Sequence, residues 1–193
     1  MDDVLLRPLG RPGDLGWVVM AHGEVYAAEF GWDGTFEALV ARIVADHAGR
    51  HDPAREAAWI AEHGGRRVGC VFCVAADERT AQLRILLVHP DARGQGLGAR
   101  LTAECIRFAR SAGYDRLRLW TNDPLVAARA VYLAAGFVLV EEEPHTSFGV
   151  DLVGQSYELD LRHPAGLVTT RRAPPRSGAA SRPAPPRAPR APR

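Results

Sequence analysis

Three glycines within five positions interrupt this chain between an apolar run and an amphipathic segment. The stretch HPDARGQGLGARL, residues 89–101, directly follows the apolar run Ile-Leu-Leu-Val at 85–88. Glycine loses more backbone freedom on folding than any other residue, so three in one ordered segment need a structural reason. The apolar run predicts a strand, and the helical spacing of apolar residues over 98–111 predicts a helix. Any fold for this chain must therefore place a glycine loop between a strand and a helix.

Strand, glycine loop and helix in succession are typical of an anion-binding site. The first turn of a helix leaves N–H groups unpaired, and the aligned peptide dipoles add partial positive charge there. The spacing of Gly94, Gly96 and Gly98 differs from the dinucleotide motif G-x-G-x-x-G, and the chain has no lysine with which to complete a P-loop. Taken alone, the loop indicates either an anionic ligand or a tight structural turn.

The rest of residues 4–161 alternates between patterns typical of strands and patterns typical of helices. A hairpin is indicated around Gly64-Gly65, Asp14 is expected to cap the first helix, and Gly113 is expected to end the third. The predicted strands are 4–9, 57–61, 67–75, 81–88, 117–121, 137–142 and 155–161, and the predicted helices are 14–30, 35–48, 98–111 and 125–135. This order predicts an α/β domain.

Size and composition fit one globular domain. With 193 residues, 47% of them hydrophobic, the chain is long enough to bury a core. It holds no run of about 20 apolar residues, and its acidic start, Met1-Asp2-Asp3, is unlike a secretory signal. The three cysteines are an odd number, and Cys70-x-x-Cys73 lies in an apolar, strand-like run, which favours buried thiols over a disulfide or a metal site. These features predict a cytoplasmic protein without a membrane partner or a metal.

The composition changes at about residue 163. Residues 163–193 hold eight of the 14 prolines, seven of the 24 basic residues and no acidic residue. Such a segment predicts a disordered tail, which is either an extension without a function or a ligand for an acidic or polyproline-recognising partner. Residues 1–162 then form the domain, with 17 basic against 23 acidic residues. This balance argues against nucleic acid as a partner of the domain and mildly favours a cationic substrate.

Two sequence blocks resemble the GNAT acetyltransferase superfamily. Residues 88–98, VHPDARGQGLG, resemble its Arg/Gln-x-x-Gly-x-Gly/Ala signature, with Arg93, Gly96 and Gly98 in the signature places. The second block is ARAVYLAAGF over residues 128–137. Together with the order of elements, the resemblance covers about residues 4–161. Residues 120–123 and 143–145 also resemble the acetyltransferase half of bacterial proteins that carry a MarR-type regulator in front.

The resemblance implies a GNAT-like acyl-CoA N-acyltransferase fold, in which a mixed central sheet has splayed middle strands and is flanked by helices. Its cleft would hold acetyl-CoA, with loop amides on the pyrophosphate and backbone groups of Leu87 and Val88 on the pantetheine arm. The family often has an asparagine seven residues before its motif tyrosine, where this chain has Leu125. Asn122 is therefore added as a substitute contact, the alternative being that it caps the next helix. The implied cofactor-binding residues are Leu87, Val88, Arg93, Gly94, Gln95, Gly96, Leu97, Gly98 and Asn122.

The chemistry implied by the resemblance centres on one tyrosine. Tyr132 matches the family tyrosine that gives a proton to the leaving thiolate, and the alternative is a packing role only. Related enzymes often carry a glutamate on the strand before the loop, but residues 81–84 contain no carboxylate. A water chain, or an acid from elsewhere, would then take the proton of the amine. By the same likeness, candidates for the acceptor site lie near the first helix and in the loop between the last strands: Glu24, Tyr26, Glu29, Trp32, His145 and Ser147.

The implied function is direct transfer of an acetyl group from acetyl-CoA to an amine of a small molecule or peptide, in a ternary complex. A non-catalytic acyl-CoA-binding sensor is the alternative, because no general base is evident. The run Glu141-Glu142-Glu143 either forms a solvated strand end or attracts a cationic acceptor by its negative charge. A homodimer is an open alternative to a monomer.

Overall fold

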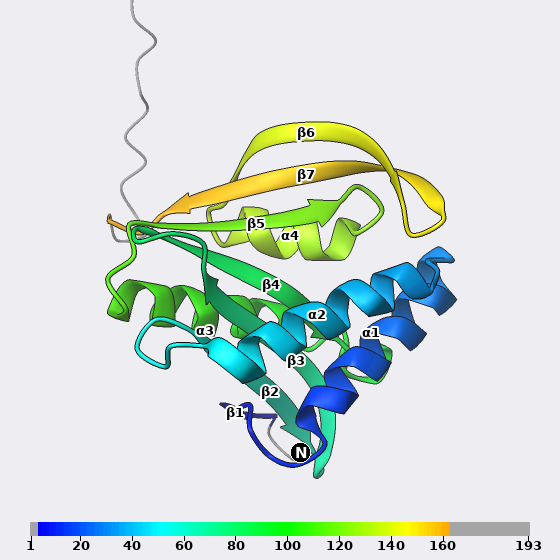
Figure 1. Cartoon of the computed structure of the whole chain (residues 1–193), viewed down its shortest axis with the longest axis horizontal. Coiled ribbons are helices and arrows are strands. Elements are labelled where there is room, and N and C mark those ends of the chain that lie inside the picture. Colours follow the sequence, from blue (N-terminus) through cyan, green and yellow to red (C-terminus); the bar gives the residue numbers. More distant parts are fainter. Residues whose placement is uncertain (1–3, 163–193) are drawn as a thin grey trace, which may run out of the picture.

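The computed structural model describes residues 4–162, which form a seven-stranded mixed sheet with helices on both faces (Figure 1). The strand order is β1-β2-β3-β4-β5-β7-β6, and neighbouring strands are antiparallel except β4 and β5, which are parallel. The α/β class and the mixed central sheet expected from the sequence are confirmed. The elements are β1 (Leu5–Pro8), α1 (Asp14–Phe30), α2 (Gly34–Arg50), β2 (Ala57–His63), β3 (Arg66–Ala75), β4 (Thr80–Val88), the 3-10 turn η1 (Pro90–Ala92), α3 (Leu97–Ser111), β5 (Arg116–Asn122), α4 (Val126–Ala134), β6 (Val138–Ser147) and β7 (Val150–Asp160).

Two apolar clusters hold the helices to the sheet. One face of β2 and β3 packs against α1 and α2, where Val18 and Val40 meet Phe72. The other face packs against α3, where Leu101 and Cys105 are fully buried. Figure 1 shows α1 and α2 in front of these strands and α3 behind them. Because β3 is covered on both faces, its sequence is apolar at almost every position instead of alternating.

Strands β4 and β5 pair over only part of their length. The register joins Thr80–Leu83 to Arg116–Leu119, and beyond Leu83 the two strands part. Ile85 has φ 43°, and the pairing of β3 with β4 is irregular at the same place, as in a β-bulge. The bulge moves the later side chains to the opposite face, so that Leu83 packs with α3 but Leu87 packs with α1 and α2. The sheet therefore opens between β4 and β5.

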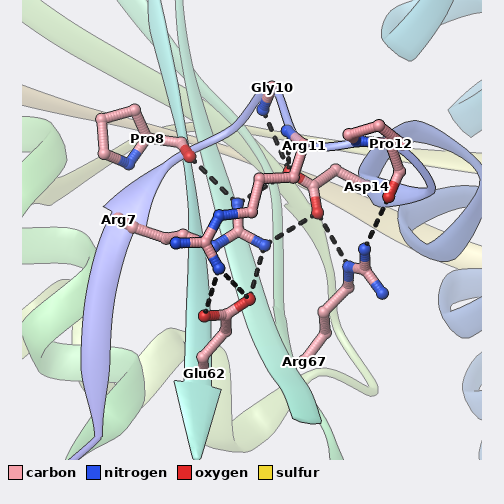
Figure 2. Close-up of polar contacts among 8 residues, drawn as sticks. All are labelled: Arg7, Pro8, Gly10, Arg11, Pro12, Asp14, Glu62 and Arg67. Atoms are coloured by element: carbon pink, nitrogen blue, oxygen red, sulfur yellow. Dashed lines mark hydrogen bonds and ion pairs between the residues drawn. The ribbon is translucent and has the colours of Figure 1, made fainter. Parts of the chain in front are cut away.

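Asp14 does not cap α1, so this prediction was wrong. The cap position is Gly13 (φ 87°), and Asp14 is the first residue of the helix. The carboxylate of Asp14 is fully buried and accepts hydrogen bonds of 2.7–2.8 Å from Arg7 and Arg67 (Figure 2). Two backbone N–H groups of the preceding loop, from Gly10 and Arg11, also donate to it. The carboxylate faces the sheet because arginines of β1 and β3 lie there, and it ties α1 to both strands.

The last two strands are longer than the sequence predicted. Strand β6 continues to Ser147, and β7 begins at Val150, where the predicted strands ended at 142 and began at 155. The two-residue turn between them has positive φ at both Phe148 and Gly149, as a tight hairpin requires. The placement of His145 and Ser147 in a loop was therefore wrong, since both belong to β6. Strand β6 is an exposed edge strand, so its residues show little of the burial pattern by which a strand is recognised.

The remaining expectations concern cysteines, metals and membranes. Cys70, Cys73 and Cys105 are buried and free of disulfides, as expected. Within residues 4–162 no group of three or more His, Cys, Asp or Glu side chains is arranged to hold a metal ion. In the same range no helix has the length and apolarity needed to cross a bilayer. The predicted tail, 163–193, lies outside the described residues.

Candidate active site

A cavity of about 360 Å³ opens beside the glycine loop, and we call it the loop cavity. Its walls are the end of β4, the loop itself, the first turn of α3, and side chains of α1 and α4. Seven of the predicted cofactor-binding residues line it together: Leu87, Val88, Arg93, Gly94, Gly96, Leu97 and Gly98. Gln95 and Asn122 do not line it. The strand–loop–helix segment thus forms one concave surface, as the sequence indicated.

Two of the three glycines of the loop have a conformational reason. Gly94 (φ 76°) and Gly96 (φ 71°) adopt the left-handed conformation that other residues rarely reach. Gly96 is also the cap residue of α3, so the unpaired N–H groups of the helix begin at this point. Gly98 has ordinary helical geometry, and a Cβ atom there would contact Val88 and Val131 at 3.5–3.7 Å. Gly94 and Gly96 therefore shape the turn, whereas the contacts of a Cβ atom at Gly98 would be ordinary and do not require glycine there.

Arg93 is anchored on the rim of the loop cavity. Its Nε donates a hydrogen bond of 3.2 Å to the Val88 carbonyl, and its Nη1 lies 2.8 Å from Oε1 of Glu29. Glu29 lines the same cavity. The structure therefore places Glu29 at the predicted coenzyme site, paired with Arg93, instead of at the acceptor site. Glu24 is exposed and lines neither of the two cavities of the cleft.

A second cavity, of about 100 Å³, lies between α1, α2 and the parted strands. We call it the aromatic pocket, because six rings line it: His22, Tyr26, Trp32, Phe36, Trp120 and Tyr132. Tyr26 packs against Phe36 and Trp32 with ring centroids 4.6 and 5.0 Å apart. Tyr26, Leu86, Leu125 and Ala128 line both cavities, so the two meet where β4 and β5 separate. Of the acceptor-site candidates, Tyr26 and Trp32 lie in this pocket.

Tyr132 lies on α4, in the wall of the aromatic pocket. It is 5% exposed, and its ring packs edge-on against Phe137 at a centroid distance of 5.9 Å. The hydroxyl makes no hydrogen bond to any residue of the described range. Burial raises the pKa of Tyr132 far above its ordinary value, so that the hydroxyl stays protonated at neutral pH. The structure thus presents a buried O–H donor beside the junction of the two cavities.

Asn122, His145 and Ser147 form one hydrogen-bonded chain. Nε2 of His145 lies 2.9 Å from Oδ1 of Asn122, and Nδ1 of His145 lies 2.9 Å from Oγ of Ser147. Because Oδ1 of Asn122 can only accept, Nε2 carries the hydrogen and Nδ1 accepts from the serine hydroxyl. The cap residue of α4 is Leu125, without a side-chain cap bond, so the capping role considered for Asn122 was wrong. Asn122 is buried and lines the aromatic pocket instead of the loop cavity.

His22 is a residue of the pocket that sequence reasoning missed. Its Nδ1 lies 2.7 Å from the Val18 carbonyl, to which it donates, and its buried Nε2 has no hydrogen-bond partner among the described residues. Burial lowers the pKa of His22 to about 4, so the ring is neutral at neutral pH. The available signal was its position: His22 lies on the buried face of α1 with Val18 and Val25, where a polar residue is unusual.

These features agree with the family that the chain matches. A family profile described as the acetyltransferase (GNAT) family matches residues 20–137, and the chain belongs to this family. A mycothiol acetyltransferase of Mycolicibacterium gilvum is 36% identical over 94 residues, which are 48% of this chain and 30% of that protein. An uncharacterized N-acetyltransferase of Schizosaccharomyces pombe is 31% identical over 123 residues, 62% of this chain and 74% of that protein. The chain thus spans less than a third of the first relative and about three quarters of the second.

Solved structures confirm the GNAT-like fold. The structure of yncA from Salmonella typhimurium, solved with its cofactor acetyl-CoA, superposes with a TM-score of 0.69 at 18% identity and covers 84% of this chain and 96% of that one. A GNAT family acetyltransferase from Elizabethkingia anophelis with acetyl-CoA bound gives a TM-score of 0.56 at 15% identity, covering 83% and 99%. At these identities the likeness concerns the fold.

Proposed function

We propose that this protein is an acetyl-CoA-dependent N-acetyltransferase that moves the acetyl group to an amine of a small molecule or peptide. The observation that carries this proposal is the junction of the two cavities at the parting of β4 and β5. The loop cavity offers an anion-binding helix N-terminus, and the aromatic pocket offers a protonated Tyr132. Family membership supports the reaction type, and the acetyl-CoA bound by two proteins of the same fold supports the donor.

The residues of the loop cavity fit coenzyme A. The N–H groups at the start of α3 face no side-chain cap, so they are available to a pyrophosphate, with Arg93 on the rim. Beyond Leu83 the edge of β4 that faces β5 has no partner among the described strands, so the backbone of Leu87 and Val88 can pair with an extended pantetheine arm. No bulky side chain fills the space at Gly96, where a Cβ atom would have no neighbour within 4 Å. Bound there, the donor supplies a thioester for attack.

The chemistry of direct transfer assigns roles to the pocket residues. The neutral amine forms a bond to the acetyl carbon, the carbon–sulfur bond breaks, and the thiolate takes a proton from Tyr132. The amine loses one proton to water in the cleft, since no carboxylate of the described residues lines the aromatic pocket, and a proton from water restores the Tyr132 hydroxyl. Asn122, held by His145, offers its amide N–H groups to the substrates. Tyr26 and Trp32 supply apolar walls that exclude bulk water.

A second candidate function is a non-catalytic acyl-CoA sensor. The absence of a carboxylate base among the described lining residues is the observation that favours it. Release of coenzyme A thiol, measured with a library of small amines and peptides, separates the two functions. We expect thiol release that depends on the acceptor, whereas tight acetyl-CoA binding without release by any acceptor would identify a sensor.

Substitution of Gly96 tests coenzyme binding. Gly96→Leu is expected to weaken acetyl-CoA binding at least about tenfold in calorimetry, because the side chain needs a backbone conformation that leucine avoids and extends toward the cavity. Gly113→Leu is the matched control: Gly113 (φ 81°) follows the other end of α3 and also has open space around it. Both variants lose similar stability, but only Gly96→Leu should lose affinity. Equal affinities in the two variants would contradict the proposed site.

We also propose that the catalytic domain ends at about residue 162. Leu161 is buried and its N–H donates to the Asp115 carbonyl at 2.8 Å, so the packed part extends at least to this residue. A chain ending at residue 162 is therefore expected to keep the acetyl-CoA affinity and turnover of the full chain. Loss of acetyl transfer on deletion of 163–193 would place the tail in the catalytic unit. If the tail binds an acidic or polyproline-recognising partner, that binding alone should disappear.

A further inference from the structure

The aromatic pocket carries one charged side chain among its described lining residues, Arg84 of β4. No aspartate or glutamate of residues 4–162 lines the pocket, and His22 is neutral there at neutral pH. An acceptor bound as a simple cation would find no counter-charge in this wall. The local charge is thus opposite to the mildly acidic balance of the domain, which on its own favoured a cationic substrate.

Arg84 lies in the wall because of strand alternation. Its neighbour Leu83 points into the core beside α3, so Arg84 faces the side of the sheet that carries α1 and α2. Burial lowers the pKa of Arg84, and the nearby Asp46 opposes this shift without forming an ion pair. Arg118 lies on the adjacent strand β5, and its like charge also lowers the pKa of Arg84. The guanidinium is therefore partly buried near the carboxylate of Asp46 without being paired to it, and it also lines a neighbouring polar cavity with Asp46 and Glu56.

Arg84 has no partner of its own among residues 4–162. It makes no hydrogen bond or ion pair with any residue that the structure describes. The other described arginines that are not exposed all have such a partner: Arg7, Arg55, Arg67 and Arg129. A partly buried guanidinium without a counter-ion is costly, and its planar fork matches a carboxylate through two parallel hydrogen bonds. We therefore expect the substrate to supply a negatively charged partner for Arg84.

We propose that the acceptor carries a carboxylate in addition to its amine, and that Arg84 binds this carboxylate in the aromatic pocket. The substrate class is that of amino acids and similar small amino-carboxylates. The amine then lies toward Tyr132 and Asn122, on the side where the pocket meets the loop cavity. This proposal rests on the proposed function, since it names the acceptor for the same site.

The test compares L-amino acids with the matching amino-acid amides, which keep the side chain and the amine but lack the negative charge. Thiol release gives kcat/KM for each compound with the native protein, with Arg84→Gln and with Arg42→Gln. Arg42 is an exposed arginine of α2 outside the pocket lining, so its variant removes the same charge elsewhere. We expect Arg84→Gln to lower kcat/KM at least about tenfold for the acids and less than about twofold for the amides. Arg42→Gln should keep the native ratio.

The ratio of acid to amide is the decisive quantity. The two amines differ in basicity, but this difference is the same in every variant and cancels in the comparison. An equal loss for acids and amides in Arg84→Gln would show a merely structural role and overturn the proposal. Turnover confined to amines without a negative charge would overturn it as well.

A binding measurement keeps the proposal testable without turnover. Trp32 and Trp120 line the aromatic pocket, so their fluorescence should change when the same amino acids are added to the protein saturated with coenzyme A. The change is expected to need at least about tenfold more amino acid in Arg84→Gln, and no response to any of the acids would refute the proposal. Calorimetry with acetyl-CoA distinguishes a failure of this proposal from a failure of the proposed function. Arg84→Gln should bind acetyl-CoA normally, whereas a native protein that does not bind acetyl-CoA would refute the proposed function instead.

Discussion

Replacement of Asp14 by alanine is expected to lower the free energy of unfolding by about 3–5 kcal/mol. The carboxylate is fully buried and receives hydrogen bonds from two arginines of two different strands, as well as from the loop that precedes α1. Without it, the side chain of Arg7, only 7% exposed, keeps a single carboxylate partner, Glu62. The loss is large because a buried charge is left incompletely paired. Chemical denaturation of both proteins measures the difference.

The control for this variant is Asp46→Ala. Asp46 pairs with Arg50 one helical turn away, and both side chains are exposed, so the cost should stay below about 0.5 kcal/mol. Burial raises the pKa of Asp14, but the hydrogen bonds from Arg7 and Arg67 outweigh burial and hold it well below its ordinary value of 3.8. A lowered pKa means that the stabilisation is fully present above about pH 4 and is lost in more acidic solution. The cost of Asp14→Ala should therefore be equal at about pH 7 and about pH 5, and a cost under about 1 kcal/mol would contradict the structural role.

Tyr132→Phe is expected to lower kcat by about 10²- to 10⁴-fold while acetyl-CoA affinity changes less than about twofold. The hydroxyl is protonated at neutral pH, buried, and placed in the aromatic pocket next to its junction with the loop cavity. Phenylalanine keeps the ring that packs against Phe137 but cannot donate a proton to the thiolate. Steady-state turnover and calorimetry, measured on the same preparation, separate the two effects.

Tyr114→Phe is the matched control for Tyr132→Phe. Tyr114 is equally buried, and its hydroxyl exchanges hydrogen bonds with Arg55 outside both cavities of the cleft. Its removal should cost about 1 kcal/mol of stability and leave kcat unchanged. Native turnover in Tyr132→Phe would remove this residue from the mechanism, and equal losses in both variants would trace the effect to packing.

The features that local sequence determines were predicted well. The loop of Gly94, Gly96 and Gly98 was recognisable because the positive φ at Gly94 and Gly96 favours glycine, whatever lies elsewhere in the chain. The helices and the central strands followed from apolar spacing for the same reason. The order of the two family blocks then joined the loop to Tyr132, although these residues are distant in sequence.

The features that depend on partners far along the chain were not predicted. Asp14 is of a residue type that often caps helices, but its carboxylate accepts a hydrogen bond from Arg67, 53 residues later in the chain. Asn122 meets His145 because β5 pairs with β7 and β7 with β6, a register that no local pattern encodes. Arg84 was not predicted for a related reason: whether an arginine in a strand has an ion-pair partner depends on residues far along the chain.

The bulge at Ile85 has a consequence for the whole molecule. Strands β1 to β4 form one continuous antiparallel ribbon, and β5, β7 and β6 form another. Within the described residues, four parallel residue pairs, from Thr80 to Leu83, are the only backbone ladder between the two ribbons. A ligand that lies across the gap would contact both ribbons, and its binding free energy would stabilise their association. A substrate bound at the proposed site would thus join the two ribbons where they part.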